Sequence, residues 1–357
     1  MRKRPSPSIL VPLLRDEPDF SGLTVPETWL AIQEAASAHR MAAVIAYTAR
    51  GQGSAEQRNW CDQVLTDSWT RHDRNIRYLD RLLAIMADAD IEVLALKCPI
   101  LGRRHFQPPF LRRTSVDIDL GVRDCDLERA VAALVREGYT PGMSIREARS
   151  TSHHLEMARP GSPPVELHTR LSKMSLGVPV DDLFARAIPH LLPTGRVAHI
   201  PCPADELLGL FIHLAGDRFA SFFHLYEVRR IWRAATPELR KEVLTSAARY
   251  RVSAAVWLAH VAVQAYWGEN LVKDETSIPK VWLRKSLNQE FLHRMESNAG
   301  AGGTRSLAAR LEGRWLDLHM TESPVDALER LTLLLRVALR ETLARRWGPV
   351  PRPELPS

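Results

Sequence analysis

The sequence predicts a mixed α/β (α+β) protein, with a core built on a small mixed sheet, N-terminal helices and a C-terminal all-helical region. Two observations support this prediction. Short apolar runs and alternating segments, both typical of strands, gather between residues 91 and 168. On both sides of that stretch, apolar residues recur at intervals of three and four, which is helical spacing. The 357 residues are enough for two or three packed units.

The N-terminal part is expected to become helical after an irregular start. Residues 1–24 are rich in proline and predict no regular element. Pro26 is typical of a helix start and opens a helical pattern that runs to about Tyr47. One broad apolar stripe then predicts a long helix over residues 55–89.

The central stretch is expected to form a compact α/β unit. Gly138 follows a helical pattern, and glycine is favoured just after a helix C-terminus. The turn-rich residues 159–163 separate two extended segments, which predicts a hairpin. The expected elements, in order, are a strand at 91–96, a helix at 99–106, a strand at 115–122, a helix at 125–137, and hairpin strands at 153–158 and 164–168.

The remainder is expected to be helical up to a proline-rich end. Helices are predicted at 203–218, 222–234, 237–250, 253–267, 280–295 and 324–346, with a glycine-rich loop at 297–304. These patterns divide the chain into an N-terminal helical region (1–89), a core (90–200), a C-terminal helical region (201–347) and a disordered tail (348–357).

Composition narrows the class of protein. Hydrophobic residues make up 45% of the chain and charged residues 25%, as in ordinary soluble globular proteins. There is no apolar run of membrane-spanning length and no signal-like stretch near the start, so we expect a cytoplasmic protein without a membrane partner. The four cysteines form no Cys-x-x-Cys pair, which disfavours zinc and redox motifs. The net charge of +6 is compatible with a nucleotide or RNA partner, but no concentrated basic tract marks a nucleic-acid surface.

Two aspartates on one predicted strand are the most informative feature. Residues 115–122 alternate small or charged side chains with aliphatic ones, so Asp117 and Asp119 share a face, about 6–7 Å apart. Carboxylates that close repel each other unless a cation lies between them. They favour hard ions such as Mg²⁺, which also coordinate phosphate oxygens. The pair suggests metal-assisted phosphoryl or nucleotidyl transfer, although Asp-x-Asp is short and also occurs at turns and strand edges.

Two basic residues flank the aspartates in the sequence. Lys97 ends the first predicted strand just before a helix start, which is a place where phosphates bind. Arg113 lies four residues before Asp117 and could contact a triphosphate or neutralise the aspartates. The alternatives are a lysine that caps the strand and a salt bridge within a loop.

A second strand repeats the alternation of polar and aliphatic residues. Glu166 and His168 share one face, and an antiparallel strand beside the aspartates would make Glu166 a third carboxylate. Three carboxylates suit two Mg²⁺ ions. His154 and Glu156 show the same alternation on the preceding strand, where they either line the same cleft or form the solvent face of a hairpin.

In this order and spacing, these residues resemble a known family. The matching segments are Leu94-Ala95-Leu96-Lys97, the run from Arg113 to Val122, Gly138-Tyr139, and Val165-Glu166-Leu167-His168. The family comprises uncharacterised bacterial nucleotidyltransferases of the DNA polymerase β-like superfamily, whose members occur beside peptide natural-product gene clusters, among other contexts. The resemblance covers roughly residues 90–235.

The resemblance implies a nucleotidyltransferase core and a role for each matching residue. Asp117, Asp119 and Glu166 would be catalytic and would bind Mg²⁺ or Mn²⁺. The nucleotide, an NTP such as ATP, would be bound by Lys97, Cys98, Arg113, Ser115 and His168. The reaction would move a nucleoside monophosphate to an acceptor that is a small molecule, a peptide or an RNA end, and natural-product biosynthesis is one setting that the resemblance suggests.

The phosphate turn departs from the family pattern. Where the family has glycine after the lysine, this chain has Cys98, followed by Pro99, which has no N–H. Both residues make a poorer phosphate cradle than glycine. A nucleotide- or partner-binding protein without activity therefore stays an alternative, as does a kinase that transfers the γ-phosphate in the same cleft.

The helical part contains two His–acid pairs. His213 and Asp217 are four residues apart, and His224 and Glu227 are three apart, so each pair could share a helix face. The alternatives are a second metal site, or residues that cap, pair or line the acceptor side of the cleft.

Overall fold

The computed structural model describes residues 5–97, 99–113, 115–171, 178–217, 219 and 221–272, without the side chain of Thr151. Cys98 and the predictions made for residues 280–295, 297–304, 324–346 and 348–357 lie outside the described residues. Among the described residues, no helix is long and apolar enough to cross a membrane.

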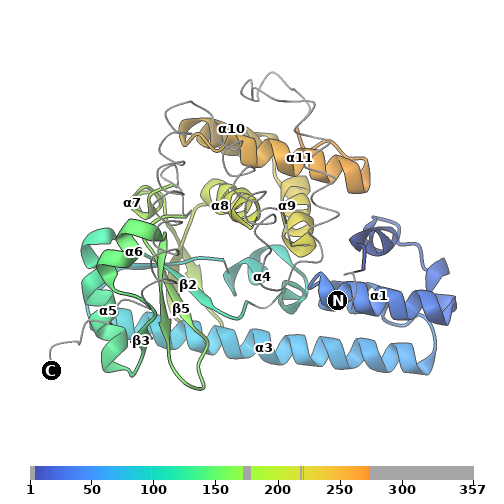
Figure 1. The fold of residues 1–357 in the computed structure, drawn as a ribbon, viewed down its shortest axis with the longest axis horizontal. Coiled ribbons are helices and arrows are strands. Elements are labelled where there is room, and N and C mark those ends of the chain that lie inside the picture. Colours follow the sequence, from blue (N-terminus) through green and yellow to red (C-terminus); the bar gives the residue numbers. More distant parts are fainter. Residues whose placement is uncertain are drawn as a thin grey trace, which may run out of the picture.

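A seven-stranded mixed sheet runs through the molecule in the order β3-β4-β5-β2-β1-β7-β6 (Figure 1). Its strands are β1 (Val93–Ala95), β2 (Ile118–Val122), β3 (Thr140–Pro141), β4 (His154–Ala158), β5 (Val165–His168), β6 (Ile188–Leu191) and β7 (Val197–Ile200). The strands predicted at 91–96, 115–122, 153–158 and 164–168 are all present, in shortened form. β6 and β7 were not predicted from the sequence; they form a hairpin that extends the sheet beyond β1.

The orientation predicted for β5 is wrong. β5 lies beside β2 but runs parallel to it, with Asp119 level with Glu166 and Gly121 level with His168. The predicted hairpin does form, and it makes β4 antiparallel to β5. Since β5, the second arm of that hairpin, is the one that pairs with β2, the hairpin sets its direction.

The two faces of the sheet pack against different helices. On one face, β-strand residues such as Ile118 and Leu120 join a core with helix α3 (Ala55–Asp88) and helix α5 (Leu127–Arg136). On the other face, Leu94 and Leu96 join a core with α7 (Val180–Phe184), α8 (Pro203–Gly216) and α9 (Phe222–Ala234). The polar residues of β2 and β5 lie on this second face, because residues level with each other on neighbouring strands share a face.

Short helices connect the strands of the central unit. They are α4 (Ile100–His105), η3 (Pro109–Leu111), η4 (Asp124–Asp126) and α6 (Ile145–Thr151). The helices expected at 99–106 and 125–137 correspond to α4 and to η4 followed by α5. Gly138 adopts a left-handed φ of 82° after α5, which is the conformation that favours glycine there.

The N-terminal region differs from its prediction in two ways. Residues 1–24 are not irregular throughout, because Ser6 caps a 3₁₀ helix, η1 (Pro7–Leu14), and a second one, η2 (Ser21–Thr24), follows. The helix expected from Pro26 to Tyr47 is two helices, α1 (Pro26–Ala38) and α2 (Ala42–Ala49). The chain turns at Arg40, whose φ is 60°, and the turn carries Met41 into the core, where it is fully buried. No glycine or proline marks this turn in the sequence.

The long helix α3 confirms the apolar stripe, and the C-terminal helices confirm the helical spacing. α8 and α9 are followed by α10 (Pro237–Arg249) and α11 (Ser253–Trp267), all close to their predicted limits. One continuous core contains buried residues of η1, α1, α2, α8, α9 and α11. Figure 1 shows α3 extending along both the sheet and the N-terminal helices. The predicted division of the chain into four regions stays a prediction.

Candidate active site

A cluster of polar side chains occupies the face of β2 and β5 that is turned toward α8 and α9. We call Asp117, Asp119, Glu166, Lys97 and His168 the sheet site. Its register comes from strand pairing, because the parallel β2–β5 pair places Glu166 beside Asp119. Asp119 and His168 are each only 1% exposed, although both are polar. Polar groups this deep need hydrogen-bond or charge partners, and those partners define the site.

Asp119 is held between two nitrogen donors. Lys97 Nζ lies 2.7 Å from Asp119 Oδ1, and His168 Nε2 lies 2.9 Å from the same oxygen. His168 Nε2 is also 3.1 Å from Glu166 Oε2. Since Nε2 faces two carboxylates, it carries the ring proton and donates to both. The buried Nδ1 atom of this ring has no hydrogen-bond partner among the described residues.

These contacts set the charges of the site. Burial alone would raise the pKa of Asp119, but the Lys97 ammonium and the His168 imidazole hold it well below its usual value. Burial opposes protonation of His168, yet its hydrogen bonds with Asp119 and Glu166 raise its pKa. Burial also favours neutral Lys97, and the negative charge of Asp119 overrides it and raises the lysine pKa. Asp119 is therefore ionised and Lys97 is charged.

Asp117 is the carboxylate with the least compensation. It precedes β2, and the Ser115 hydroxyl donates a hydrogen bond to its Oδ1. Burial and the negative charges of Asp119 and Glu166 raise its pKa, against the opposing effects of Ser115 and Lys97. The charges of Asp119 and Glu166 both act on Asp117. Among the described residues of the sheet site, the ligand atoms that lie within 4.8 Å of one another are those of Asp119, Glu166 and His168, without Asp117.

Asn75 positions this loop and was not identified from the sequence. It lies on α3, is 1% exposed, and its Nδ2 donates to the Ser115 carbonyl at 3.0 Å. The one sign of this role in the sequence is that Asn75, an amide, stands directly before the apolar residue Ile76, and both are buried on α3. Asn75 therefore fixes the backbone two residues before Asp117.

The histidines of β4 extend the cluster. His154 is level with His168 on β5, and its Nε2 lies 3.5 Å from Glu166 Oε1. Ligand atoms of His153, His154 and His168 lie within 4.8 Å of one another. Of the two alternatives for His154 and Glu156, the structure brings His154 into the site, whereas Glu156 is exposed. His153 was not identified from the sequence, where its only signal is the His-His doublet.

A second polar cluster lies where α8 turns into α9. We call His213, Asp217, His224 and Arg113 the helix corner. His213 lies on the last turn of α8, Asp217 lies at the end of that helix, and His224 lies on the first turn of α9. Asp217 Oδ2 is 3.2 Å from His224 Nδ1 and 3.6 Å from His213 Nε2. The i,i+4 pairing predicted for His213 and Asp217 is thus present.

Arg113 decides the proton position in the helix corner. Its Nη1 lies 3.1 Å from His224 Nε2. A guanidinium only donates, so Nε2 accepts and the ring proton is on Nδ1, facing Asp217. A metal ion at Nδ1 would have to displace that proton, although the ligand atoms of His213, Asp217 and His224 lie within 4.8 Å of one another. The arrangement favours the pairing interpretation over a second metal site.

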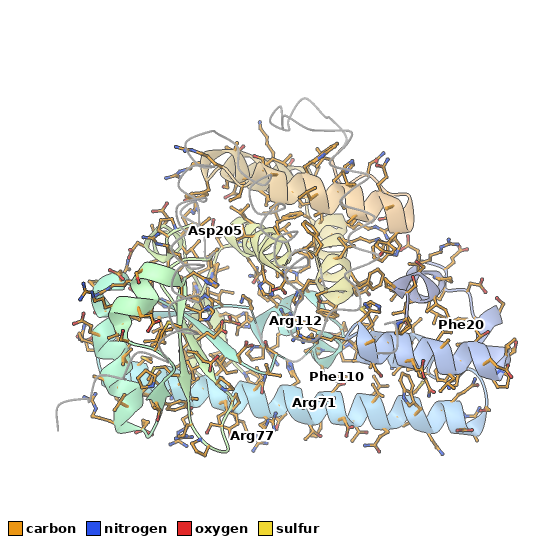
Figure 2. The ribbon with its side chains drawn as sticks, viewed as in Figure 1. Phe20, Arg71, Arg77, Phe110, Arg112 and Asp205 are labelled. Carbon is orange, nitrogen blue, oxygen red and sulfur yellow. The ribbon has the colours of Figure 1, made fainter. Side chains whose placement is uncertain are left out.

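Glu227 does not pair with His224 as the sequence suggested. It is fully buried and accepts from Arg112, whose Nε lies 2.5 Å from Glu227 Oε1. Figure 2 shows Arg112 between α3 and α9. This ion pair joins the segment before β2 to α9. Because Arg112 is next to Arg113 in the chain, the pair also helps to hold Arg113 in position.

The two clusters face each other. The positive charge of Lys97 is among the causes that shift the pKa of both His213 and Asp217, and the negative charge of Asp119 also acts on His213. Burial, followed by Lys97 and His224, lowers the pKa of His213 well below its usual value. A neutral imidazole, 29% exposed, thus lies across from the carboxylates.

The chemistry of the sheet site fits a divalent cation. Asp117, Asp119 and Glu166 provide carboxylate oxygens, the ligands that Mg²⁺ and Mn²⁺ prefer. Burial, followed by the negative charges of Asp119 and Glu166, raises the pKa of Asp117, and a cation bound nearby would oppose that shift. Ligand atoms of Asp119 and Glu166 lie within 4.8 Å of each other, while the third atom of that group, His168 Nε2, carries a proton.

Comparison with known proteins supports this picture at the level of the family. No curated protein matches the chain. The sequence model of a family described as "Uncharacterised nucleotidyltransferase" matches residues 26–268, which is well over half of the chain and includes every residue of the sheet site and the helix corner. The chain therefore belongs to this family of uncharacterised nucleotidyltransferases, which implies an NTP substrate.

Proposed function

We propose that this protein moves a nucleoside monophosphate from an NTP, with ATP as the first candidate, to an acceptor, with release of pyrophosphate. The reaction would depend on Mg²⁺ or Mn²⁺, and the core would belong to the DNA polymerase β-like superfamily. One observation carries the proposal: Asp119 and Glu166 lie side by side on a sheet face turned toward helices, beside a charged lysine, and the charges of both carboxylates act on Asp117.

Each carboxylate has a distinct place in the proposed mechanism. Asp117 and Asp119 would hold the cation, and Glu166 would complete the ligand set. When bound, the cation would polarise the reacting phosphate and favour an ionised acceptor oxygen. His168 fixes the orientation of Asp119 and Glu166 through its Nε2 proton. Glu166, whose side chain is 17% exposed, is the best-placed carboxylate to take a proton from the acceptor.

Basic residues would bind the triphosphate. Lys97 ends the segment after β1 in a left-handed conformation, with a φ of 45°. Its ammonium lies beside Asp119 and would turn to phosphate oxygens once a cation neutralises that carboxylate. Arg113 is held by His224 and would contribute a second positive charge from the helix side. Ser115 and Cys98 complete the proposed nucleotide-binding set.

The helix corner would face the acceptor. Its neutral His213 lies across from the carboxylates, where a hydroxyl or amine could approach. Small molecules, peptides and RNA ends all remain candidates, and a cytoplasmic role in natural-product biosynthesis is part of the proposal.

A product mass tests the proposal directly. The protein is incubated with mixed NTPs, Mg²⁺ and a cell extract, and new products are identified by mass spectrometry. An acceptor that gains a nucleoside monophosphate supports nucleotidyl transfer, whereas a gain of phosphate alone identifies a kinase. Asp119→Asn should abolish the product, and Glu156→Gln, an exposed change on the same sheet face, should not.

A non-catalytic binding protein is the second candidate, and the Lys97–Asp119 ion pair favours it. The ammonium already occupies one side of Asp119 without any metal. Titration of ATP and Mg²⁺ into the wild type and into Cys98→Gly would separate the two. Tight binding without turnover in both proteins, for every acceptor class tried, would support the binding protein.

A further inference from the structure

A cavity outside the sheet site and the helix corner lies where the N-terminal segment meets α9. Its volume is about 740 Å³, which is large enough for a small organic molecule, and its rim is open to solvent, because Arg15 and Arg230 are both exposed. Residues of η1, α2, α4 and α9 line it. Its apolar wall consists of Leu13, Leu14, Val44, Leu111, Tyr226 and Ile231.

The charged lining of this cavity is strongly unbalanced. It contains Arg15, Arg104, Arg229, Arg230 and Arg233, with Asp16 as the acidic residue of the lining. An arginine keeps its charge at every physiological pH, so this imbalance cannot titrate away.

Three of the five arginines are neutralised by carboxylates. Arg104 pairs with Glu206 at 2.8 Å, and Arg229 pairs with Glu269 through two hydrogen bonds. Arg233 donates hydrogen bonds to both carboxylate oxygens of Asp16, from Nη1 to Oδ1 at 2.9 Å and from Nη2 to Oδ2 at 2.7 Å. The last of these pairs ties the loop after η1 to α9. These three arginines therefore build the wall of the cavity.

Two arginines remain for a ligand. Within the described ranges, neither Arg15 nor Arg230 forms an ion pair within 4 Å, although Arg15 lies near enough to Asp19 to help lower the pKa of that carboxyl. Arg230 is nonetheless held in place, because its Nε donates to the His105 carbonyl at 3.1 Å and its guanidinium lies 5.1 Å from the centre of the Phe106 ring. Only Nε is used in this contact, so its terminal N–H groups stay available. A guanidinium fixed in this way loses little freedom on binding an anion.

We infer that this cavity binds a small organic anion. Its apolar body would lie against the apolar wall, and its carboxylate or phosphate group would lie at Arg230 and Arg15. Carboxylate and phosphate share the geometry that matches the guanidinium fork. The site is separate from the proposed nucleotide site, because none of the five residues of the sheet site lines it. The inference does not depend on the proposed function.

Calorimetric titration with three related probes tests the inference. The probes are 1-naphthyl phosphate, 1-naphthoate and the neutral 1-naphthalenemethanol, which share one apolar body. We expect both anions to bind at least about tenfold more tightly than the neutral probe, the effect of one charge-assisted hydrogen bond. Tighter binding of the phosphate or of the carboxylate identifies the natural head group. Equal binding of all three, or no binding of any, would overturn the inference.

Variants locate the binding site. Arg230→Gln should weaken both anions about tenfold and leave the neutral probe unchanged, because it removes one charge-assisted contact. Arg230→Lys keeps the charge but loses the fork, so its effect should be smaller. Arg71→Gln, on the exposed face of α3 (Figure 2), is the matched control and should change nothing. Thermal unfolding checks that each variant folds.

A variant of the sheet site separates this cavity from the nucleotide site. Lys97→Gln should bind 1-naphthyl phosphate as tightly as the wild type, because Lys97 does not line the cavity. If Lys97→Gln weakens the probe, or if Arg230→Gln binds it as tightly as the wild type, the probe binds elsewhere and the inference is wrong.

Discussion

The sheet site and the helix corner contain similar residue types but differ in their balance of charge. The sheet site has three carboxylates against one ammonium and one imidazole that is more basic than usual. The helix corner has one carboxylate, Asp217, against the guanidinium of Arg113, together with two imidazoles. At the sheet site, burial and the negative charges of Asp119 and Glu166 raise the pKa of Asp117. At the helix corner, by contrast, burial is outweighed by His224 and His213, and the pKa of Asp217 falls far below its usual value.

Proximity alone therefore does not make a metal site. Both clusters bring three ligand atoms within 4.8 Å of one another, and in both of them a histidine nitrogen carries a proton. The helix corner is then left with the single carboxylate of Asp217, whereas the sheet site still offers the carboxylates of Asp119 and Glu166, with Asp117 near enough for their charges to act on it. We therefore predict cation binding at the sheet site and none at the helix corner.

The largest expected effect comes from removing Asp119. Asp119→Asn should lower Mg²⁺-dependent turnover about 1,000-fold, which corresponds to about 4 kcal/mol, because it removes the carboxylate that Lys97 and His168 both contact. Mn²⁺ affinity, measured by calorimetry, should fall with it. Glu156→Gln is the control, and undiminished Mn²⁺ binding in Asp119→Asn would refute the assignment of the sheet site.

A somewhat smaller effect is expected beneath the helix corner. Glu227→Gln removes one partner of the buried Arg112–Glu227 pair and should cost about 3 kcal/mol of unfolding free energy. Urea denaturation measures the change. Asp16→Asn, which breaks the exposed pair with Arg233, is the control and should have little effect. A similar small effect in both variants would mean that Arg112 does not depend on Glu227 to hold its neighbour Arg113.

His72, a buried histidine on α3, makes the stability of the folded protein depend on pH. Burial, together with the positive charge of Arg103, lowers its pKa to about 4, against the opposing charge of Asp73. Between pH 6.5 and 4 the unfolded chain therefore takes up a proton that the folded protein does not. Stability should fall as the pH falls through this window, by about 3 kcal/mol in total, and level off below it.

The His72 prediction is checked by difference. Urea denaturation of the wild type and of His72→Gln between pH 7.5 and 4 cancels the contributions of other groups. The wild type should lose more stability than the variant as the pH falls. His199→Gln, at an exposed histidine on β7, should follow the wild type. Parallel curves for all three proteins would show that His72 takes up its proton at the same pH in the folded protein as in the unfolded chain.

The smallest effect is expected at the helix corner itself. Asp217→Asn should leave Mn²⁺ affinity within about twofold, which is less than 0.5 kcal/mol, because the proton on His224 Nδ1 already excludes a metal there. Calorimetry under the conditions used for Asp119→Asn measures it. A tenfold loss would make the helix corner a second metal site and would end the contrast between the two clusters.

Much of this fold could be predicted from the sequence, because its signals are local. Helical spacing predicted α3, α9 and α11 closely, and alternation predicted β2 and the β4–β5 hairpin. The turn at Arg40 was missed, because a non-glycine residue there adopts a positive φ. The β6–β7 hairpin was missed because its strands are short, and two of its residues, Leu191 and Val197, leave large apolar side chains exposed.

The candidate site was predicted in composition but not in geometry. The sequence pointed to Asp117, Asp119 and Glu166; the structure places Asp119 beside Glu166, and the charges of both act on Asp117. The parallel direction of β5 and the position of His168 between two carboxylates could not be predicted. Neither could the contact from Asn75, which lies 40 residues from Ser115 in the chain.

The alternation of polar and aliphatic residues is written in the sequence, and with it which side chains of β2 and β5 point away from the core. Which of these side chains meet, and with what balance of charge, depends on how the elements pack. Periodicity is encoded over two to four residues. Strand partners, helix corners and buried ion pairs are instead chosen by the free energy of burying whole faces against one another. That choice separated the carboxylate-rich sheet site from the balanced helix corner.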